Sequence, residues 1–342
     1  MRRDKIGLAN QHIYYRLVAF WVVCEAFAGG IMHGLKLPFT GMIVSSLAVI
    51  SIILIAWYVP HRSAIIKATI IVAVFKLILS PHSPPTAYIA VFFQGIVGEI
   101  LFSTRRFFLI SSILLAVLAL VESAIQRILV LVILYGNDFW KAVNIFIKRL
   151  IGDEHISNYS LLLASLYVLL HAITGCLVGF FGGRLAKQSS TWQLPPALTI
   201  EKQTVESVPS ERKRNKKLKK IFIVLWIVMV ALFIQSLIQP EQSILPPTIA
   251  VGILFRSFLV VLSWYLVVSP LIMIIIKRVL KKQQEKNKQA LSEIMLLIPE
   301  TRYIFTRSWY LSKTKSGISR LKFFLKIVLI NILASPVDNK PA

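Results

Sequence analysis

The sequence predicts an all-α, polytopic integral membrane protein with about eight transmembrane helices. Hydrophobic residues make up 56% of its 342 residues and charged residues only 16%, whereas a soluble domain carries roughly 25% charged residues. The apolar residues gather in runs long enough to cross a bilayer, which takes about 20 residues. The charge is one-sided, with 39 Lys and Arg against 15 Asp and Glu, a net charge of +24. This composition excludes a disordered chain, a fibrous repeat and an ordinary soluble enzyme.

Eight apolar segments qualify as membrane spans, and prolines separate several of them. They lie at about Leu17–Gly34, Pro38–Val59, Ala64–Ser80, Thr86–Phe102, Phe107–Leu134, Ser160–Gly183, Ile221–Ile238 and Thr248–Ile276. The last segment is long enough to be either one tilted span or a broken helix. We therefore expect a six-helix bundle over residues 1–185 and a two-span module with basic cytoplasmic helices over residues 221–342.

A basic and polar linker separates these two expected modules. Ten basic residues lie between Arg184 and Lys220, and three prolines interrupt the same stretch. Such a composition predicts a flexible cytoplasmic connection over residues 186–220.

Basic residues indicate which side of the membrane each loop occupies, because loops rich in Lys and Arg stay in the cytoplasm. The turns after the third and seventh expected spans hold no Lys or Arg, whereas the stretch after the sixth is strongly basic. This alternation predicts a multi-pass protein of the cell membrane with both termini in the cytoplasm. Residues 135–159 are the exception, because they carry Lys141, Lys148 and Arg149 on the expected outer side. Interleaved apolar residues indicate an outer interfacial helix there; the alternative is that the fifth segment does not cross fully.

Most of the positive charge lies in two stretches of the chain. Twenty-four of the 39 cations fall between Arg184 and Lys220 or between Lys277 and Lys340. Such stretches bind anionic lipid, with about 1 kcal/mol per cation near the surface. Nucleic-acid binding requires aromatic residues among the cations or a recognisable module, and the run from Glu211 to Lys220 has neither. We therefore expect anionic lipid as a partner and no nucleic acid.

The sequence carries no motif of a known catalytic or metal centre. It has no P-loop, no GxSxG, no HExxH and no CxxC motif, so no ATPase machinery of its own is expected. Its six histidines are scattered, and no pair has metal-ligand spacing on one helix. We therefore expect no enzyme, no metal and no cofactor, and a membrane-embedded enzyme is the least favoured interpretation.

Several polar and ionisable side chains fall inside the expected spans, where a charged residue near a helix centre costs about 2.5–3.5 kcal/mol to insert. They are Glu25, Lys76, Glu99, Glu122, Gln126, Arg127, His171 and Arg256. One interpretation is a satisfied structural network. The other is a polar pocket or a proton path inside the six-helix bundle.

Two outer hairpins and a glycine stripe complete the pattern. Residues 33–41 and 80–88 lie on the expected outside, and the second hairpin contains three prolines. A loop of this kind is either a simple turn or a rigid lid over a ligand pocket. Gly175, Gly179 and Gly183 repeat every fourth residue on the sixth span, which permits close helix packing within the bundle or against a partner.

The arrangement resembles the membrane subunits of energy-coupling factor (ECF) vitamin transporters. Residues 1–185 are similar to the six-helix, substrate-binding S component in length, in the small residues Ala26, Gly30 and Gly34 of the first span, and in the outer hairpins. The resemblance implies a binding cavity beneath those hairpins.

The second module resembles the later part of the T-component scaffold. The segments that carry this likeness are Gly252–Leu259, Val268–Leu271 and Leu296–Pro299, followed by Arg302 and Arg307. In that family, cytoplasmic coupling helices with Arg-centred motifs dock onto ATPase subunits. The chain departs from the family in lacking Ala-Arg-Gly motifs and in having too few spans for a whole T component.

These features lead to one main hypothesis, a membrane component of an uptake transporter for a small solute of the vitamin or cofactor-precursor type. The candidate ligand-binding residues are Trp21, Glu25, His33, Lys76, His82 and Gln94. The candidate partner-coupling residues are Arg302, Arg307 and Arg320, and the resemblance implies ATPase subunits as their partners. The alternative hypothesis is a membrane scaffold or assembly protein that binds no solute.

Overall fold

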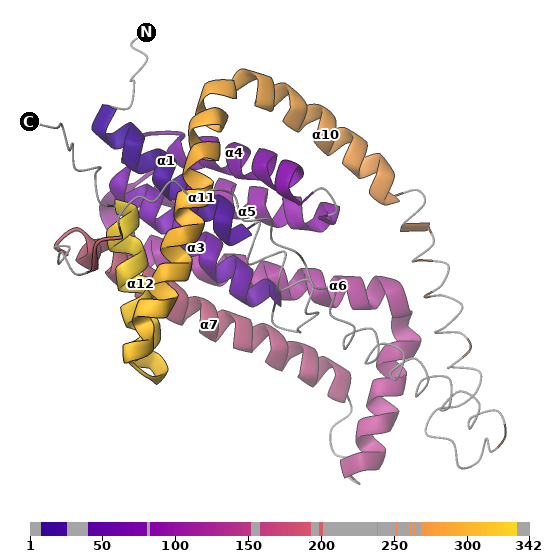
Figure 1. The fold of residues 1–342 in the computed structure, drawn as a ribbon. Helices are drawn as coiled ribbons and strands as arrows, with labels where there is room; N and C mark the ends of the chain where they lie inside the picture. The colour runs from indigo at the N-terminus through magenta and orange to yellow at the C-terminus, as the bar shows by residue number, and fades with distance from the viewer. Residues whose placement is uncertain are drawn as a thin grey trace, which may run out of the picture. The chain divides into compact units, whose positions relative to one another are not determined.

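The computed structural model describes residues 8–25, 40–80, 83–151, 158–192, 198–200 and 268–333, together with positions 238, 251, 257, 260, 263 and 264. Within these residues the fold is all-helical, as expected (Figure 1). The chain divides into two compact units. The first unit comprises Met1–Leu120, Ala172–Val208 and Ile275–Ala342, and the second comprises Val121–His171 and Pro209–Ile274.

The first unit contains helices from both ends of the chain. Its elements are α1 (Leu8–Val23), α3 (Thr40–Tyr58), α4 (Ala64–Leu79), α5 (Pro85–Phe102), the short 3-10 helix η2 (Arg105–Phe107), the start of α6 (Phe108–Ile151), the end of α7 (Tyr159–Ser189), most of α10 (Ser269–Lys286), α11 (Lys288–Leu311), the 3-10 helix η5 (Ser312–Thr314) and α12 (Gly317–Leu333). The remaining parts of α6 and α7 belong to the second unit.

Four helices in the described part of the chain, α3, α5, α6 and α7, are long and apolar enough to cross a membrane. The class of the fold is therefore that of an α-helical membrane protein. The sequence predicts eight spans, and α4, one of the expected spans, is a helix of 16 residues. The expected spans at 221–238 and 248–276 lie largely outside the described residues.

The core of the first unit is a packed group of α1, α3, α4 and α5. Helix α3 is apolar on nearly every side, and residues such as Ile52, Ile53 and Leu54 are fully buried. Helices α4 and α5 approach closely where Gly95 faces Thr69, because a Cβ atom at position 95 would collide with the threonine side chain. Only residues 80–84 separate the end of α4 from Pro85 at the start of α5, and the two helices pack side by side and antiparallel.

The glycine stripe of α7 packs inside the protein, against α6. A Cβ atom on Gly175 would lie 2.7 Å from the Cα atom of Val117, and one on Gly179 would lie 2.5 Å from the Cα atom of Ile113. Only glycine permits so close an approach of two backbones. The interpretation of the stripe as internal packing is therefore the one that the structure supports.

Helix α6 is interrupted at Gly136, whose φ of 69° and ψ of −168° are not helical. This φ value lies in the region that glycine adopts without a steric penalty. The residues after this break are helical up to Ile151, and the rings of Phe139 and Trp140 lie 5.3 Å apart. The sequence predicts an interfacial helix in this region; helical structure is present, and its depth in a membrane stays a prediction.

Helices α11 and α12 pack against α1 (Figure 1). The buried side chains of α11 recur every three or four residues, including Leu291, Ile294 and Ile298, which gives the helix one apolar face. The first unit thus joins helices from the expected six-helix bundle to helices from the expected second module.

Candidate functional site

A buried ion pair lies between α1 and α4. Lys76 Nζ donates to Glu25 Oε2 at 2.6 Å, and the two side chains are only 7% and 4% exposed. Eleven residues earlier on α1, the hydroxyl of Tyr14 donates to the carbonyl oxygen of Ala64 at 3.3 Å. Because both contacts join residues about 50 positions apart, α1 and α4 run parallel and stay in register. The pair therefore lies at the end of the helix group that the sequence places toward the outside.

Three further polar side chains are buried in the same helix group without a complete set of partners. Gln94 Nε2 donates to Ser45 Oγ at 3.2 Å, while Gln94 Oε1 has no hydrogen-bond partner within the described residues. The same holds for Trp21 Nε1 and the Tyr88 hydroxyl, and all three residues are at most 1% exposed. Buried polar atoms are nearly always paired in native proteins. These atoms are therefore candidates to bind a polar molecule.

Helix register places two of these residues, Trp21 and Tyr88, near the ion pair. Trp21 precedes Glu25 by four residues on α1, so both side chains lie on one helix face. Helices α4 and α5 are antiparallel with Gly95 opposite Thr69, so the residue level with Lys76 is Tyr88. Gln94 lies six residues beyond Tyr88 on α5, about 9 Å further along the helix axis, with its partner Ser45 on α3. We call Trp21, Glu25, Lys76 and Tyr88, together with this Gln94–Ser45 pair, the buried polar cluster.

Four of the six predicted ligand-binding residues, Trp21, Glu25, Lys76 and Gln94, belong to the buried polar cluster. The other two, His33 and His82, lie outside the described residues. Sequence reasoning missed Tyr88 and Ser45. Tyr88 could have been predicted from the proline-rich segment 80–84. If the helices on either side of this segment are antiparallel, Lys76 and Tyr88 lie level with each other, because each is six residues from its midpoint.

A buried arginine connects α1 to the two C-terminal helices. Arg16 Nη2 donates to Glu300 Oε1 on α11 at 2.9 Å. Its Nη1 donates to the carbonyl oxygens of Asn331 and Ile332 at 3.2 and 3.4 Å. Because α12 ends at Leu333, these oxygens belong to its last turn, where a cation is stabilising. Burial lowers the pKa of Arg16, and the carboxylate of Glu300 opposes this shift.

Aromatic contacts reinforce the same junction. The rings of Phe20 on α1 and Phe305 on α11 are stacked, with centroids 5.5 Å apart and an interplanar angle of 15°. Phe324 on α12 lies 6.1 Å from Phe305. The junction of α1, α11 and α12 therefore combines apolar packing with one buried charge that is bonded through both terminal nitrogens of its guanidinium.

A short segment of the expected linker is attached to α12. The side chain of Asn331 donates through Nδ2 to the carbonyl oxygen of Leu198 at 3.1 Å and accepts at Oδ1 from the backbone N–H of Ile200 at 3.0 Å. The side chain of Asn331 thus pairs with one backbone carbonyl and one backbone N–H of this segment, groups that would otherwise need another partner.

The predicted partner-coupling arginines lie on α11 and α12. The guanidinium of Arg320 lies 4.3 Å above the ring of Trp309, and its Nε donates to Ser312 Oγ at 3.4 Å. Arg307 lies 5.6 Å from the ring centroid of Tyr310. Arg302 and Arg307 are exposed, and Arg320 is partly buried. The structure thus places two of the three in cation–π contacts close to the turn between α11 and α12.

Glu122 and His171, two of the ionisable residues predicted for the fifth and sixth spans, bond within their own helices. In the second unit, Gln126 Nε2 donates to Glu122 Oε1 on α6. The Nδ1 atom of His171 lies 2.9 Å from the carbonyl oxygen of Tyr167 on α7. Both contacts are local to one helix. They fit the interpretation of these residues as structural better than that of a polar pocket or proton path.

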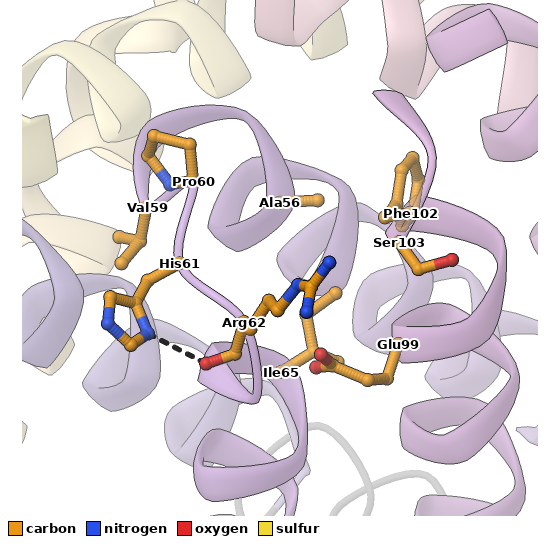
Figure 2. A pocket seen from close by; sticks show the side chains of 9 residues that line it. All are labelled: Ala56, Val59, Pro60, His61, Arg62, Ile65, Glu99, Phe102 and Ser103. Carbon is orange, nitrogen blue, oxygen red and sulfur yellow. Dashed lines mark hydrogen bonds between the residues drawn. The ribbon is translucent and has the colours of Figure 1, made fainter. Parts of the chain in front are cut away.

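A cavity of about 220 Å³ opens at the other end of α4 and α5. Figure 2 shows His61, Arg62, Glu99 and Ser103 around it, with apolar residues that include Pro60 and Phe102. Glu99, one of the ionisable residues noted in the sequence, lines this cavity, whereas none of the predicted ligand-binding or partner-coupling residues does. No group of three or more metal-ligating side chains occurs in the portion of the chain that the structure describes.

The chain was compared with known proteins at three levels. No protein-family model, no curated protein and no solved structure matches it. The resemblance to ECF transporter subunits therefore stays a prediction, and functional conclusions depend on the geometry of the chain itself.

Proposed function

We propose that the protein is a multi-pass component of the cell membrane that takes up a small solute of the vitamin or cofactor-precursor type. The solute binds at the buried polar cluster. The observation that carries this proposal is the ion pair of Glu25 and Lys76, accompanied by the unpartnered polar atoms of Trp21, Tyr88 and Gln94.

Energetics favour a functional role for this cluster. A buried ion pair seldom stabilises a protein more than well-packed apolar residues of the same volume do. Each buried polar atom without a partner costs about 1–3 kcal/mol. A helix bundle that served only as a scaffold would gain stability by replacing these side chains with apolar ones. Polar residues retained at membrane depth therefore support a binding site.

The same proposal includes the topology, with about eight spans and both termini in the cytoplasm. Under this topology the cluster faces the outside, where the solute enters. Helix α1 carries Arg16 of the junction with α11 and α12, and the π-helical turn that directly follows α1 carries Glu25 of the cluster, nine residues later. A shift of α1 on solute binding would reach the helices that carry Arg302, Arg307 and Arg320. Those helices are the proposed docking site for ATPase subunits of an ECF-type complex.

The alternative is a membrane scaffold without a solute. The observation that favours it is the extensive apolar junction of α1 with α11, which includes the stacked rings of Phe20 and Phe305. Such a junction holds the two ends of the chain together whether or not a solute binds.

Native purification followed by mass spectrometry distinguishes the two functions. The transporter function predicts a bound small molecule at near-stoichiometric occupancy and co-purification of an ATPase from the source membrane. A preparation that holds neither a small molecule nor an ATPase, and instead retains only structural membrane proteins, contradicts it and favours the scaffold.

A further inference from the structure

The cavity at the ends of α3 and α5 presents charges of both signs to one ligand. Arg62 lies on one side of it, and Glu99 and Ser103 lie on the other (Figure 2). It is formed by the turn between α3 and α4 and by the last turn of α5. It therefore lies at the opposite end of α4 and α5 from the buried polar cluster and is separate from the proposed solute site.

The walls of this cavity are held in place before any ligand arrives. Glu99 Oε1 accepts from the backbone N–H of Ser63 at 2.7 Å, and Oε2 accepts from that of Ile66 at 3.4 Å. Ser63 is held at a φ of 66°, a left-handed conformation that costs energy for a residue other than glycine. His61 Nδ1 lies 2.7 Å from the carbonyl oxygen of Arg62, as the dashed line in Figure 2 marks. The turn that carries Arg62 is therefore preorganised.

The acceptors in the cavity match a primary ammonium group. A carboxylate offers about four lone-pair positions, so Glu99 retains acceptor capacity beyond its two backbone bonds. The hydroxyl of Ser103 donates to the carbonyl oxygen of Ile100 at 2.6 Å, which leaves its lone pairs to accept. A primary ammonium has three N–H donors, and these two side chains accept from them.

The donor in the cavity matches a phosphate. Arg62 is exposed, and its planar guanidinium suits two oxygens of a phosphodiester. A ligand with an ammonium and a phosphate is neutral overall, so it leaves neither Arg62 nor Glu99 without a countercharge.

The surroundings of the cavity are those of a lipid headgroup. Helices α3 and α5, which end at it, are two of the helices able to span a membrane. Trp57 at the end of α3 packs against Phe108, and tryptophan favours the interface between membrane and water. Ile96 and Ile100 are 48% and 64% exposed and lie four residues apart on α5. On α5 they precede the cavity residues Phe102 and Ser103, so the exposed surface of the span next to this end of the helix is apolar, as acyl chains require.

We propose that this cavity binds the phosphoethanolamine headgroup of a membrane phospholipid. The phosphate binds Arg62, the ammonium binds Glu99 and Ser103, and the acyl chains follow Ile100 and Ile96. Phosphatidylglycerol has no ammonium for Glu99, and the trimethylammonium group of phosphatidylcholine has no N–H to donate. Both lipids bind this cavity more weakly.

Native mass spectrometry of the full chain tests this assignment. The protein is released from nanodiscs that contain equal amounts of phosphatidylethanolamine, phosphatidylglycerol and phosphatidylcholine. The wild type retains one phosphatidylethanolamine in about tenfold preference to the other two. Arg62→Gln lowers the retention of all three lipids, because each carries the phosphate that Arg62 binds, whereas the matched control Arg106→Gln, an exposed arginine that does not line the cavity, keeps the wild-type retention. Glu99→Gln equalises the retention of phosphatidylethanolamine and phosphatidylcholine.

Several outcomes overturn the assignment. Equal retention of the three lipids does so, as does preference for phosphatidylglycerol or an unchanged amount of retained lipid in Arg62→Gln. Free phosphoethanolamine that binds as tightly as the lipid shows that the cavity serves a soluble ligand instead. If Glu99→Gln fails to fold because Ser63 loses its partner, the exposed Arg62→Gln and Arg106→Gln variants still decide the matter.

Discussion

Breaking the ion pair of the buried polar cluster gives the most informative stability measurement. Lys76→Met removes the ammonium and leaves the carboxylate of Glu25 buried, with the pair's side chains only 7% and 4% exposed in the wild type. Loss of one member of a buried pair costs about 3–5 kcal/mol, because the other charge loses its countercharge. We expect the free energy of unfolding to fall by that amount.

Removing both charges reverses most of this loss. In the double variant Glu25→Gln/Lys76→Met, no buried charge is left uncompensated. Its free energy of unfolding is at most about 1 kcal/mol below that of the wild type, or is higher than that of the wild type. The matched control is Lys67→Met on the same helix, because Lys67 is exposed. Its effect stays within about 0.5 kcal/mol.

Chemical denaturation in mixed micelles measures five proteins under one condition: the wild type, the single variants Glu25→Gln and Lys76→Met, the double variant and Lys67→Met. The reasoning is refuted if Lys76→Met and Lys67→Met lose the same amount of stability. It is also refuted if the double variant is as unstable as the sum of its single variants, since the two charges would then act independently.

Three further substitutions test other parts of the fold. Arg16→Met leaves Glu300 and the last carbonyl oxygens of α12 without their donor, and denaturation shows a loss of about 3 kcal/mol; an unchanged stability argues against this junction. Gly179→Val places a side chain against the backbone of Ile113, so the free energy of unfolding measured by denaturation falls by about 1–3 kcal/mol. The control Cys176→Val, at an exposed position of the same helix, leaves it unchanged; an equal loss in both variants contradicts the close packing of α7 on α6. Asn331→Leu removes the acceptor of the Ile200 N–H, so hydrogen exchange at that amide becomes about tenfold faster; unchanged exchange shows that this contact does not hold the segment.

Composition and hydropathy were enough to predict the helical membrane class and the approximate bounds of the spans that form α3, α5 and α7. Those signals are local, because a membrane span needs a continuous apolar run of fixed length. Ionisable residues inside such runs likewise marked Glu25 and Lys76, since polar groups at membrane depth are rare and costly.

Contacts between distant segments were beyond the reach of the sequence. Nothing in the spacing of residues indicates that Arg16 caps α12, because the partners are more than 300 residues apart. The cavity at Arg62 and Glu99 escaped prediction for the same reason, since it includes a left-handed Ser63 whose backbone N–H donates to Glu99, 36 residues further along the chain. Nothing in the sequence distinguishes Tyr88 from other aromatic residues of the spans. Its position level with Lys76 follows only from the register of α4 against α5.

Solute binding at the buried polar cluster is the central claim, and a thermal-shift screen measures it most directly. The full chain in detergent is heated with each member of a panel of water-soluble vitamins and their biosynthetic precursors. The account predicts that at least one compound raises the Tm, that Tyr88→Phe and Gln94→Leu abolish this shift, and that Gln126→Leu on α6 retains it. A shift that survives Tyr88→Phe and Gln94→Leu, or a panel without any shift in a protein that co-purifies with no small molecule, contradicts the account.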